Sequence, residues 1–129
     1  MNVAQALASI LKSECIEVLF CYPNSKVIDE AALLGIRPVV VRQERSGLHM
    51  ADAVSKLSSG QKIGVFAMQH GPGSENSFGG VAQSFGDSVP VLVLPQGYPQ
   101  NVAPIKPNFS SATTMRDVSK LAEVLTLPD

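Results

Sequence analysis

The chain has 129 residues, of which 45% are hydrophobic and 16% are charged, a composition typical of one globular domain. With 10 Lys and Arg against 11 Asp and Glu, interspersed along the chain, no basic patch is available for nucleic acid or an anionic membrane. The longest apolar run, residues 89–95, is far too short to cross a bilayer.

Hydrophobic spacing predicts strands that alternate with helices. Val3, Leu7 and Leu11 repeat at helical spacing and begin the series. Continuous apolar runs predict strands over residues 18–22, 38–41, 63–68 and 90–94. Helices are predicted between them, from a cap at Ser25 to a stop at Gly35, over residues 45–59, and after residue 73. The fourth helix is expected to face inward with Phe78, Val81, Ala82 and Phe85.

The end of the chain has a different character. Residues 95–113 contain four prolines without periodicity, which predicts an extended connector. Thr114 and Asp117 stand at the spacing of a capping box, so a last helix is predicted over residues 114–126.

This order of elements predicts the fold class. Strands covered on both faces read as uninterrupted apolar runs, and helices between them produce parallel pairing. We therefore expect an α/β fold with a three-layer, doubly wound, mainly parallel sheet, a flavodoxin-like topology with helices on both faces. Ligands bind such sheets outside the carboxyl ends of the strands. The polar or Gly/Pro-rich segments 22–25, 42–46, 69–76 and 95–98 all lie at that edge.

Taken one at a time, the candidate motifs have simple structural interpretations. The loop Gly71-Pro72-Gly73-Ser74-Glu75-Asn76 lacks the third glycine of a dinucleotide fingerprint, so a tight turn with Ser74 as helix cap explains it. Glu44 alone is equally an acidic residue in a first helical turn. His49 and His70 have no Cys or His partners at the spacing of a zinc site, and no metal ligands are predicted.

In chain order, however, the loop motifs form a recognisable series. They are Tyr22-Pro23-Asn24-Ser25, Arg42-Gln43-Glu44, His49-Met50-Ala51-Asp52-Ala53, Gly71-Pro72-Gly73-Ser74-Glu75-Asn76, Asp87-Ser88-Val89-Pro90-Val91 and Gln96-Gly97. Over nearly the whole chain this series resembles the N-terminal pyrimidine-binding domain of thiamine-diphosphate enzymes, the acetolactate synthase/pyruvate decarboxylase family.

The resemblance implies a role for each matching residue. Glu44 is expected to hydrogen-bond the aminopyrimidine ring of thiamine diphosphate and so promote removal of the thiazolium proton. The residues expected to shape the pyrimidine pocket are Tyr22, Pro23, Pro72 and Asn76. The residues expected to face the substrate are Gln69, His70 and Gln96.

Departures from the family pattern concern the substrate side. Asn24-Ser25 replaces a Gly-Gly pair, Gln69-His70 replaces small hydroxyl residues, and Gln96-Gly97 inverts the usual order. These differences favour a distinct acetolactate-synthase-like or 2-oxo-acid decarboxylase subgroup.

The resemblance also implies a partner. The family holds the diphosphate and Mg²⁺ in a separate domain with a Gly-Asp-Gly…Asn motif, and that motif does not occur in these residues. We therefore expect residues 1–129 to form one pyrimidine-binding domain that shares thiamine diphosphate with another domain or subunit, in a homo- or hetero-oligomer acting on a small 2-oxo acid. A non-catalytic flavodoxin-like binding or docking module, or a subunit of a split decarboxylase, remains an alternative. Two cysteines and no basic segment before an apolar run favour the cytoplasm.

Overall fold

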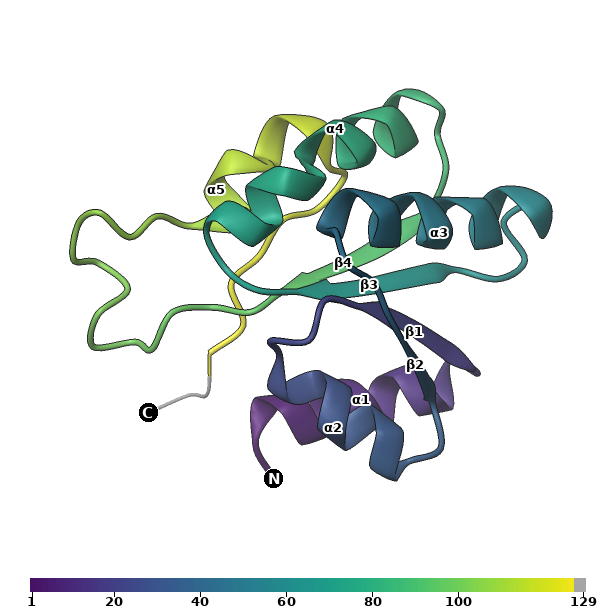
Figure 1. Cartoon of the computed structure of the whole chain (residues 1–129), viewed down its shortest axis with the longest axis horizontal. Coiled ribbons are helices and arrows are strands. Elements are labelled where there is room, and N and C mark those ends of the chain that lie inside the picture. The colour runs from purple at the N-terminus through teal and green to yellow at the C-terminus, as the bar shows by residue number, and fades with distance from the viewer. Residues whose placement is uncertain (127–129) are drawn as a thin grey trace.

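Four parallel strands form the centre of the molecule, which a computed structural model describes over residues 1–126 (Figure 1). The strands are β1 (Val18–Cys21), β2 (Arg37–Val40), β3 (Gly64–Met68) and β4 (Val91–Pro95). Their spatial order is β2-β1-β3-β4, and every neighbouring pair is parallel. The predicted parallel α/β sheet is confirmed.

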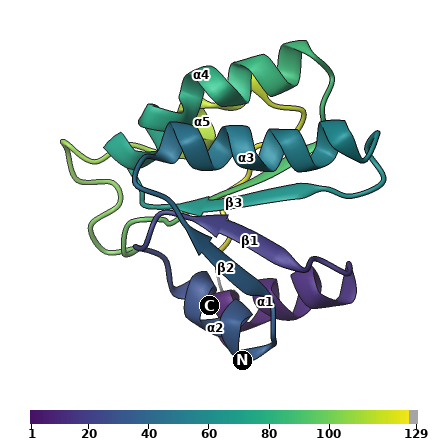
Figure 2. The ribbon, with the colours of Figure 1, turned by 45° about the vertical axis from the view of Figure 1, so that its right-hand side comes forward.

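Helices cover both faces of this sheet (Figures 1 and 2). On one side lie α1 (Val3–Ser13) and α2 (Lys26–Leu33), and on the other lie α3 (Glu44–Leu57) and α4 (Pro72–Gly86). The three-layer, doubly wound arrangement therefore also agrees with the prediction. No helix within residues 1–126 is both long and apolar enough to cross a membrane.

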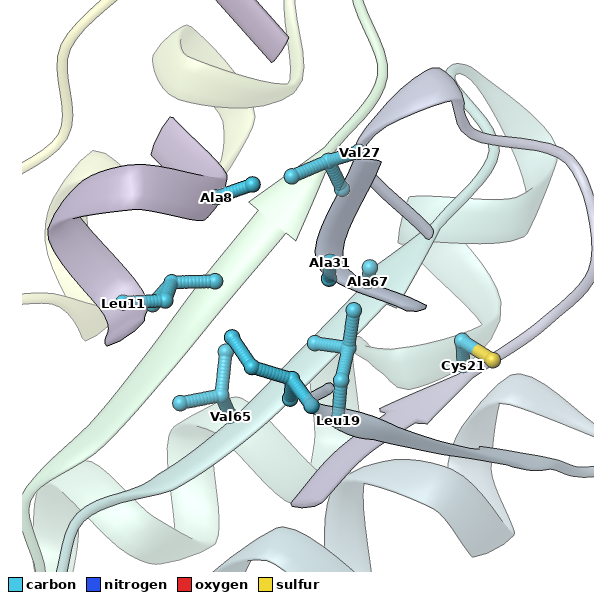
Figure 3. Close-up of a cluster of buried hydrophobic side chains, with 9 residues drawn as sticks. Ala8, Leu11, Leu19, Cys21, Val27, Ala31, Val65 and Ala67 are labelled. Carbon is cyan, nitrogen blue, oxygen red and sulfur yellow. The ribbon is translucent and has the colours of Figure 1, made fainter. Parts of the chain in front are cut away.

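Alternation along the strands builds two separate hydrophobic cores. Because successive side chains point to opposite faces, Leu19 and Val65 pack against α1 and α2 while Phe20 and Phe66 pack toward α3. Figure 3 shows the first of these clusters, in which small and branched side chains from β1, β3, α1 and α2 meet. All five residues of β3 are buried, as expected for a strand covered on both faces.

Glycine allows α3 to lie unusually close to β3. A Cβ atom on Gly64 would collide with the backbone carbonyl of Ala51, and one on Gly47 would collide with the ring of Phe66. At these two positions helix and strand touch through backbone and ring atoms, while Leu48 and Ala51 of α3 pack in the same core as Phe66. This approach sets the height of α3, and therefore of its first residue Glu44, above the sheet.

We predict that Gly64→Ala lowers the free energy of unfolding by at least about 2 kcal/mol, because the added methyl group meets backbone that cannot rotate away. Gly79→Ala is the matched control, since a Cβ atom there meets nothing within 4 Å. In the interior of α4 that change should stabilise the chain by up to about 1 kcal/mol. Urea unfolding of both variants measures the difference, and equal effects of the two substitutions would contradict the close-approach explanation.

The inward face of α4 agrees with the prediction at Val81, which is buried, and at Phe78, which packs against the core, but not at Phe85. Phe85 is 50% exposed rather than inward. The buried positions of α4 are instead small residues, namely Gly73, Ser74, Ser77, Gly80, Val81 and Ser84. The reason is the tight packing of α4 against α3, where even a Cβ atom on Gly80 would lie 2.5 Å from Leu48. Phe85 therefore finds no space where α4 packs tightly against α3.

The predicted helix over residues 114–126 is wrong. The chain forms a short helix α5 (Ser111–Thr114) and a 3₁₀-helix η1 (Arg116–Val118), and residues 119–126 contain no helix or strand. Ser110, not Thr114, caps α5, while the hydroxyl of Thr114 donates to Glu75. Val118 packs against the core, but Leu121 and Leu125 are 77% and 59% exposed, so the later apolar positions at helical spacing are not covered. Short helices depend on such packing for their stability.

The connector itself is shorter than the predicted span 95–113. Pro95 still belongs to β4 and residues 111–113 already belong to α5, so the irregular segment covers residues 96–110.

Candidate functional site

The carboxyl ends of β1 and β3 define the candidate site, because the chain adds its strands in opposite directions on either side of these two parallel neighbours. From β1 the chain passes outward to β2, then returns to the other side of β1 as β3. Such a switch point separates two adjacent loops and creates space for a ligand. Here the loops are tied together, because Asn24 Nδ2 donates a hydrogen bond of 3.2 Å to Gln69 Oε1.

Glu44 and Asn76 meet beside this switch point. Glu44 is the first residue of α3 and is only 6% exposed. Asn76 Nδ2, from the second turn of α4, donates to Glu44 Oε2 at 2.6 Å. Within the described residues the other carboxylate oxygen, Oε1, makes no hydrogen bond, and it is not among the enclosed polar atoms. A buried carboxyl group therefore presents one unoccupied oxygen atom to the surface.

The pocket residues expected around this carboxyl group lie on the neighbouring segments. The half-buried Tyr22 continues β1, its backbone N–H donating to Ala67 O at 2.9 Å, and its ring packs against the core beneath α3. Pro23 and Pro72 are exposed. Pro72 is the first residue of α4, a position where the missing N–H of proline costs no helical hydrogen bond.

The turn that leads into α4 depends on glycine. Gly71 has a φ of 60° and a ψ of −126°, and a Cβ atom there would lie 2.6 Å from the Tyr98 hydroxyl oxygen. Ser74 is not the helix cap: it lies within the first turn, and its hydroxyl donates to Gly71 O at 2.8 Å. The backbone of this turn is therefore held from both sides.

Side chains of α5 make two further hydrogen bonds to the turn that leads into α4. The hydroxyl groups of Ser74 and Ser111 are hydrogen-bonded, and Thr114 Oγ1 donates to Glu75 Oε1 at 2.8 Å. Met115 is buried in the core beneath α3 and α4. The segment around Thr114, predicted as the start of the last helix, thus fastens the turn that carries Asn76.

The three residues expected on the substrate side also lie at this edge. Gln69 touches Asn24 as described, and His70 packs its ring against that of Tyr98 with a centroid separation of 4.0 Å and an interplanar angle of 48°. Gln96 follows β4, and its backbone N–H donates to Met68 O at 2.8 Å. Among residues 1–126, no hydrogen bond joins the side chain of any of these three residues to the Glu44–Asn76 pair.

The sequence placed Tyr98 at this edge, within the segment 95–98, but did not single it out as a site residue. It lies two residues beyond Gln96 in the loop after β4, and its only sequence signal is that position after a strand. The hydrogen bond between Asn24 and Gln69 was missed as well, although both residues had been noted as departures from the family pattern.

An ionic cluster that includes the buried Asp52 joins α3 to the end of α4. Asp52, which is 6% exposed, accepts a hydrogen bond of 2.8 Å from Ser84 Oγ and forms an ion pair of 2.9 Å with Lys56. Lys56 also pairs with Asp87 at 2.9 Å. Burial raises the pKa of the Asp52 carboxyl, but the hydrogen bonds from Lys56 and Ser84 outweigh it, so this pKa lies below the usual value. Contacts with Asp52 and Asp87 raise the pKa of Lys56.

We predict that this cluster makes the stability of the chain sensitive to acid. Because the pKa of Asp52 is lowered on folding, its contribution is complete above the unfolded carboxyl pKa of about 3.9 and disappears as the pH falls through the lower, folded value. Wild-type chain should therefore exceed Asp52→Asn in stability by a constant amount near neutral pH, and the two should converge in acid. Urea unfolding at a series of pH values measures this, with Asp117→Asn as the exposed control. A difference that persists unchanged in acid would contradict the assignment.

The sequence of this chain is similar to those of known proteins. Residues 1–115 match the family described as thiamine pyrophosphate enzyme, N-terminal TPP binding domain. The chain belongs to this family. Within residues 1–126, no three His, Cys, Asp or Glu side chains gather where they could hold a metal ion.

Its relatives include acetolactate synthase large subunits. The chain is 35% identical over 98 residues to the acetolactate synthase large subunit of Haemophilus influenzae, covering 73% of this chain and 17% of that protein. It is 33% identical over 98 residues to the Escherichia coli acetolactate synthase isozyme 3 large subunit, with the same coverage. It is also 33% identical over 97 residues, 73% of this chain and 16% of the relative, to a probable acetolactate synthase large subunit of Methanococcus aeolicus. The chain thus spans about one sixth of the length of these relatives.

Proposed function

We propose that this chain is the pyrimidine-binding half of a thiamine-diphosphate-dependent enzyme that acts on 2-oxo acids. Membership of the family and similarity to acetolactate synthase large subunits support the cofactor and the substrate class. The observation that carries the proposal is the Glu44–Asn76 pair, in which a carboxyl group only 6% exposed keeps one oxygen open at the edge of the sheet.

The residues at this position fit an aminopyrimidine ring. A ring nitrogen that carries or accepts a proton matches Glu44 Oε1, the oxygen left without a hydrogen bond inside the described chain. Asn76 Nδ2 occupies Oε2 at 2.6 Å and so fixes the orientation of the carboxyl plane. Burial at the start of α3 leaves Oε1 as the part of the Glu44 carboxyl group that is open to a ligand. The proposed neighbours of the ring are Tyr22, Pro23 and Pro72.

The chemistry divides between the cofactor and the chain. When bound, thiamine diphosphate supplies the stabilised carbanion that reacts with the 2-oxo acid. Glu44 holds and returns a proton at the ring nitrogen through Oε1. Asn76 prevents the carboxyl group from rotating away during that transfer. At the same edge, Gln69, His70 and Gln96 face the substrate.

The diphosphate and its Mg²⁺ are proposed to be held by another domain or subunit. We further propose an oligomer, homo- or hetero-, in which that partner completes the active site, and a cytoplasmic location in keeping with the free thiols of Cys15 and Cys21. Carboligation of the acetolactate synthase type and decarboxylation both use this arrangement. The departures at Asn24, Gln69 and His70 favour a substrate distinct from that of the named relatives.

The alternatives need no buried acid at this position. A non-catalytic binding or docking module gains nothing from keeping a carboxyl group out of water, because an unpaired buried charge is costly. The single hydrogen bond from Asn76 compensates only part of that cost. A subunit of a split 2-oxo-acid decarboxylase uses the same residues in the same roles, so it differs from the main proposal only in how the polypeptides are divided.

We predict that Glu44→Gln lowers the rate of thiazolium proton exchange about 10²–10⁴-fold, the usual contribution of a positioned general acid–base group. The amide keeps the shape and one hydrogen-bonding oxygen but cannot transfer the proton. Exchange is measured by NMR on thiamine diphosphate bound to the chain together with its diphosphate-binding partner.

Glu17→Gln is the matched control, because Glu17 is exposed and precedes β1 at the opposite end of the sheet. It should leave the exchange rate unchanged. Exchange at the wild-type rate in Glu44→Gln would refute the catalytic role and favour the binding-module alternative.

We also predict that the chain alone binds thiamine diphosphate weakly and without dependence on Mg²⁺. The pyrimidine contacts reside here, whereas the charged diphosphate has no proposed ligand in this chain. Titration calorimetry with and without Mg²⁺ provides the measurement. Tight binding that requires Mg²⁺ would show that the chain holds the diphosphate itself.

A further inference from the structure

The loop after β4 folds back over the turn after β3 and brings Tyr98 against His70. The two rings lie 4.0 Å apart between centroids, tilted by 48°. The Tyr98 hydroxyl rests over Gly71, where a Cβ atom would lie only 2.6 Å from it. Only glycine at position 71 leaves room for this arrangement, and its φ of 60° also suits glycine. The position of the His70 ring is therefore set by two separate loops.

The two ring nitrogens of His70 differ in their burial. Nδ1 is enclosed by protein and has no hydrogen-bond partner within residues 1–126. Nε2 is not enclosed in this way, and His70 lines, with Gln96, Tyr98 and Phe109, one part of a broad groove that extends along β4 toward α1. One polar atom is thus buried without a partner, while the other remains available.

The burial decides which nitrogen carries the proton. A neutral imidazole has one N–H donor and one acceptor nitrogen. Burying an N–H group without an acceptor is costly, and orphaned N–H groups are rarer in proteins than under-satisfied acceptors. The proton therefore belongs on Nε2, where it faces the groove as a single hydrogen-bond donor.

We infer that Tyr98 is a positioning residue that fixes His70 as the Nε2–H tautomer, and that this N–H recognises a carboxylate oxygen of the substrate. The inference rests on the proposed function, since it deepens the substrate side of the same site. A fixed donor favours a carboxylate over a neutral carbonyl group, because hydrogen bonds to a charged acceptor are about twice as strong. It assigns to Tyr98 a role in selecting 2-oxo acids over their neutral analogues.

The first test reads the tautomer directly. In the chain labelled with ¹⁵N in histidine, long-range ¹H–¹⁵N correlation distinguishes a protonated from an unprotonated ring nitrogen. His70 should show a proton on Nε2 in the wild type and in Tyr98→Phe, which keeps the stacked ring. Tyr98→Ala should give the averaged pattern of a free imidazole. His49 is exposed on α3 and serves as the internal control. A proton on Nδ1, or averaging in the wild type, would overturn the inference.

The second test adds ligands to the same samples. Sodium pyruvate should shift the His70 signals saturably and leave those of His49 in place, whereas methyl pyruvate, which lacks the carboxylate, should not. Tyr98→Ala should weaken the response to pyruvate by roughly tenfold, the order expected for loss of one oriented hydrogen bond to a charged group. Unshifted His70 signals, or equal responses to pyruvate and its ester, would exclude carboxylate recognition.

Failure here and failure of the proposed function give different results. Thiamine added to the chain should shift the side-chain amide signal of Asn76, which reports on the Glu44 pair. If thiamine shifts the Asn76 amide signal while pyruvate leaves the His70 signals unchanged, the result supports the cofactor site and refutes the role of His70. If thiamine has no effect on Asn76, the cofactor assignment itself falls.

Discussion

The close approach of α3 to β3 is the constraint on which the rest of the site depends. Two glycines make it possible, since Gly64 lies against the carbonyl of Ala51 and Gly47 against the ring of Phe66. Because neither glycine has a side chain that would hold helix and strand apart, α3 lies close to β3, with Glu44 as its first residue. Glu44 is consequently buried at the edge of the sheet, where a first-turn acidic residue would ordinarily be solvated.

Small side chains also form much of the contact between α3 and α4. Gly80 faces Leu48, and the buried serines of α4 bond to neighbouring carbonyl and carboxylate groups, as Ser84 does to Asp52. This tight packing brings Asn76 within hydrogen-bond distance of Glu44. A polar, small-residue interface can be positioned more exactly than one of large aliphatic side chains, because each hydrogen bond has a directional optimum. The packing of α3 against α4 thus fixes the orientation of the Glu44 carboxyl group.

Much of this architecture could be predicted from the sequence, and each failed prediction has a physical reason. Uninterrupted apolar runs such as residues 63–68 predict covered parallel strands, and the order of loop motifs identifies Glu44 as the residue of interest. Periodicity fails for α4, where Phe85 was expected inward, because a face of glycine and serine has little hydrophobic signal. It fails again after residue 114, because apolar spacing alone cannot show that Leu121 lacks a packing partner. The contact of His70 with Tyr98 joins two loops 28 residues apart and becomes visible only when the chain is folded.

A structure of the chain with thiamine diphosphate and the protein that completes the site measures the central claim most directly. The account predicts that the pyrimidine ring nitrogen lies within hydrogen-bond distance, about 2.6–3.2 Å, of Glu44 Oε1 while Asn76 still donates to Oε2. A pyrimidine ring bound elsewhere, or a Glu44 carboxyl group turned away from it, would contradict the account.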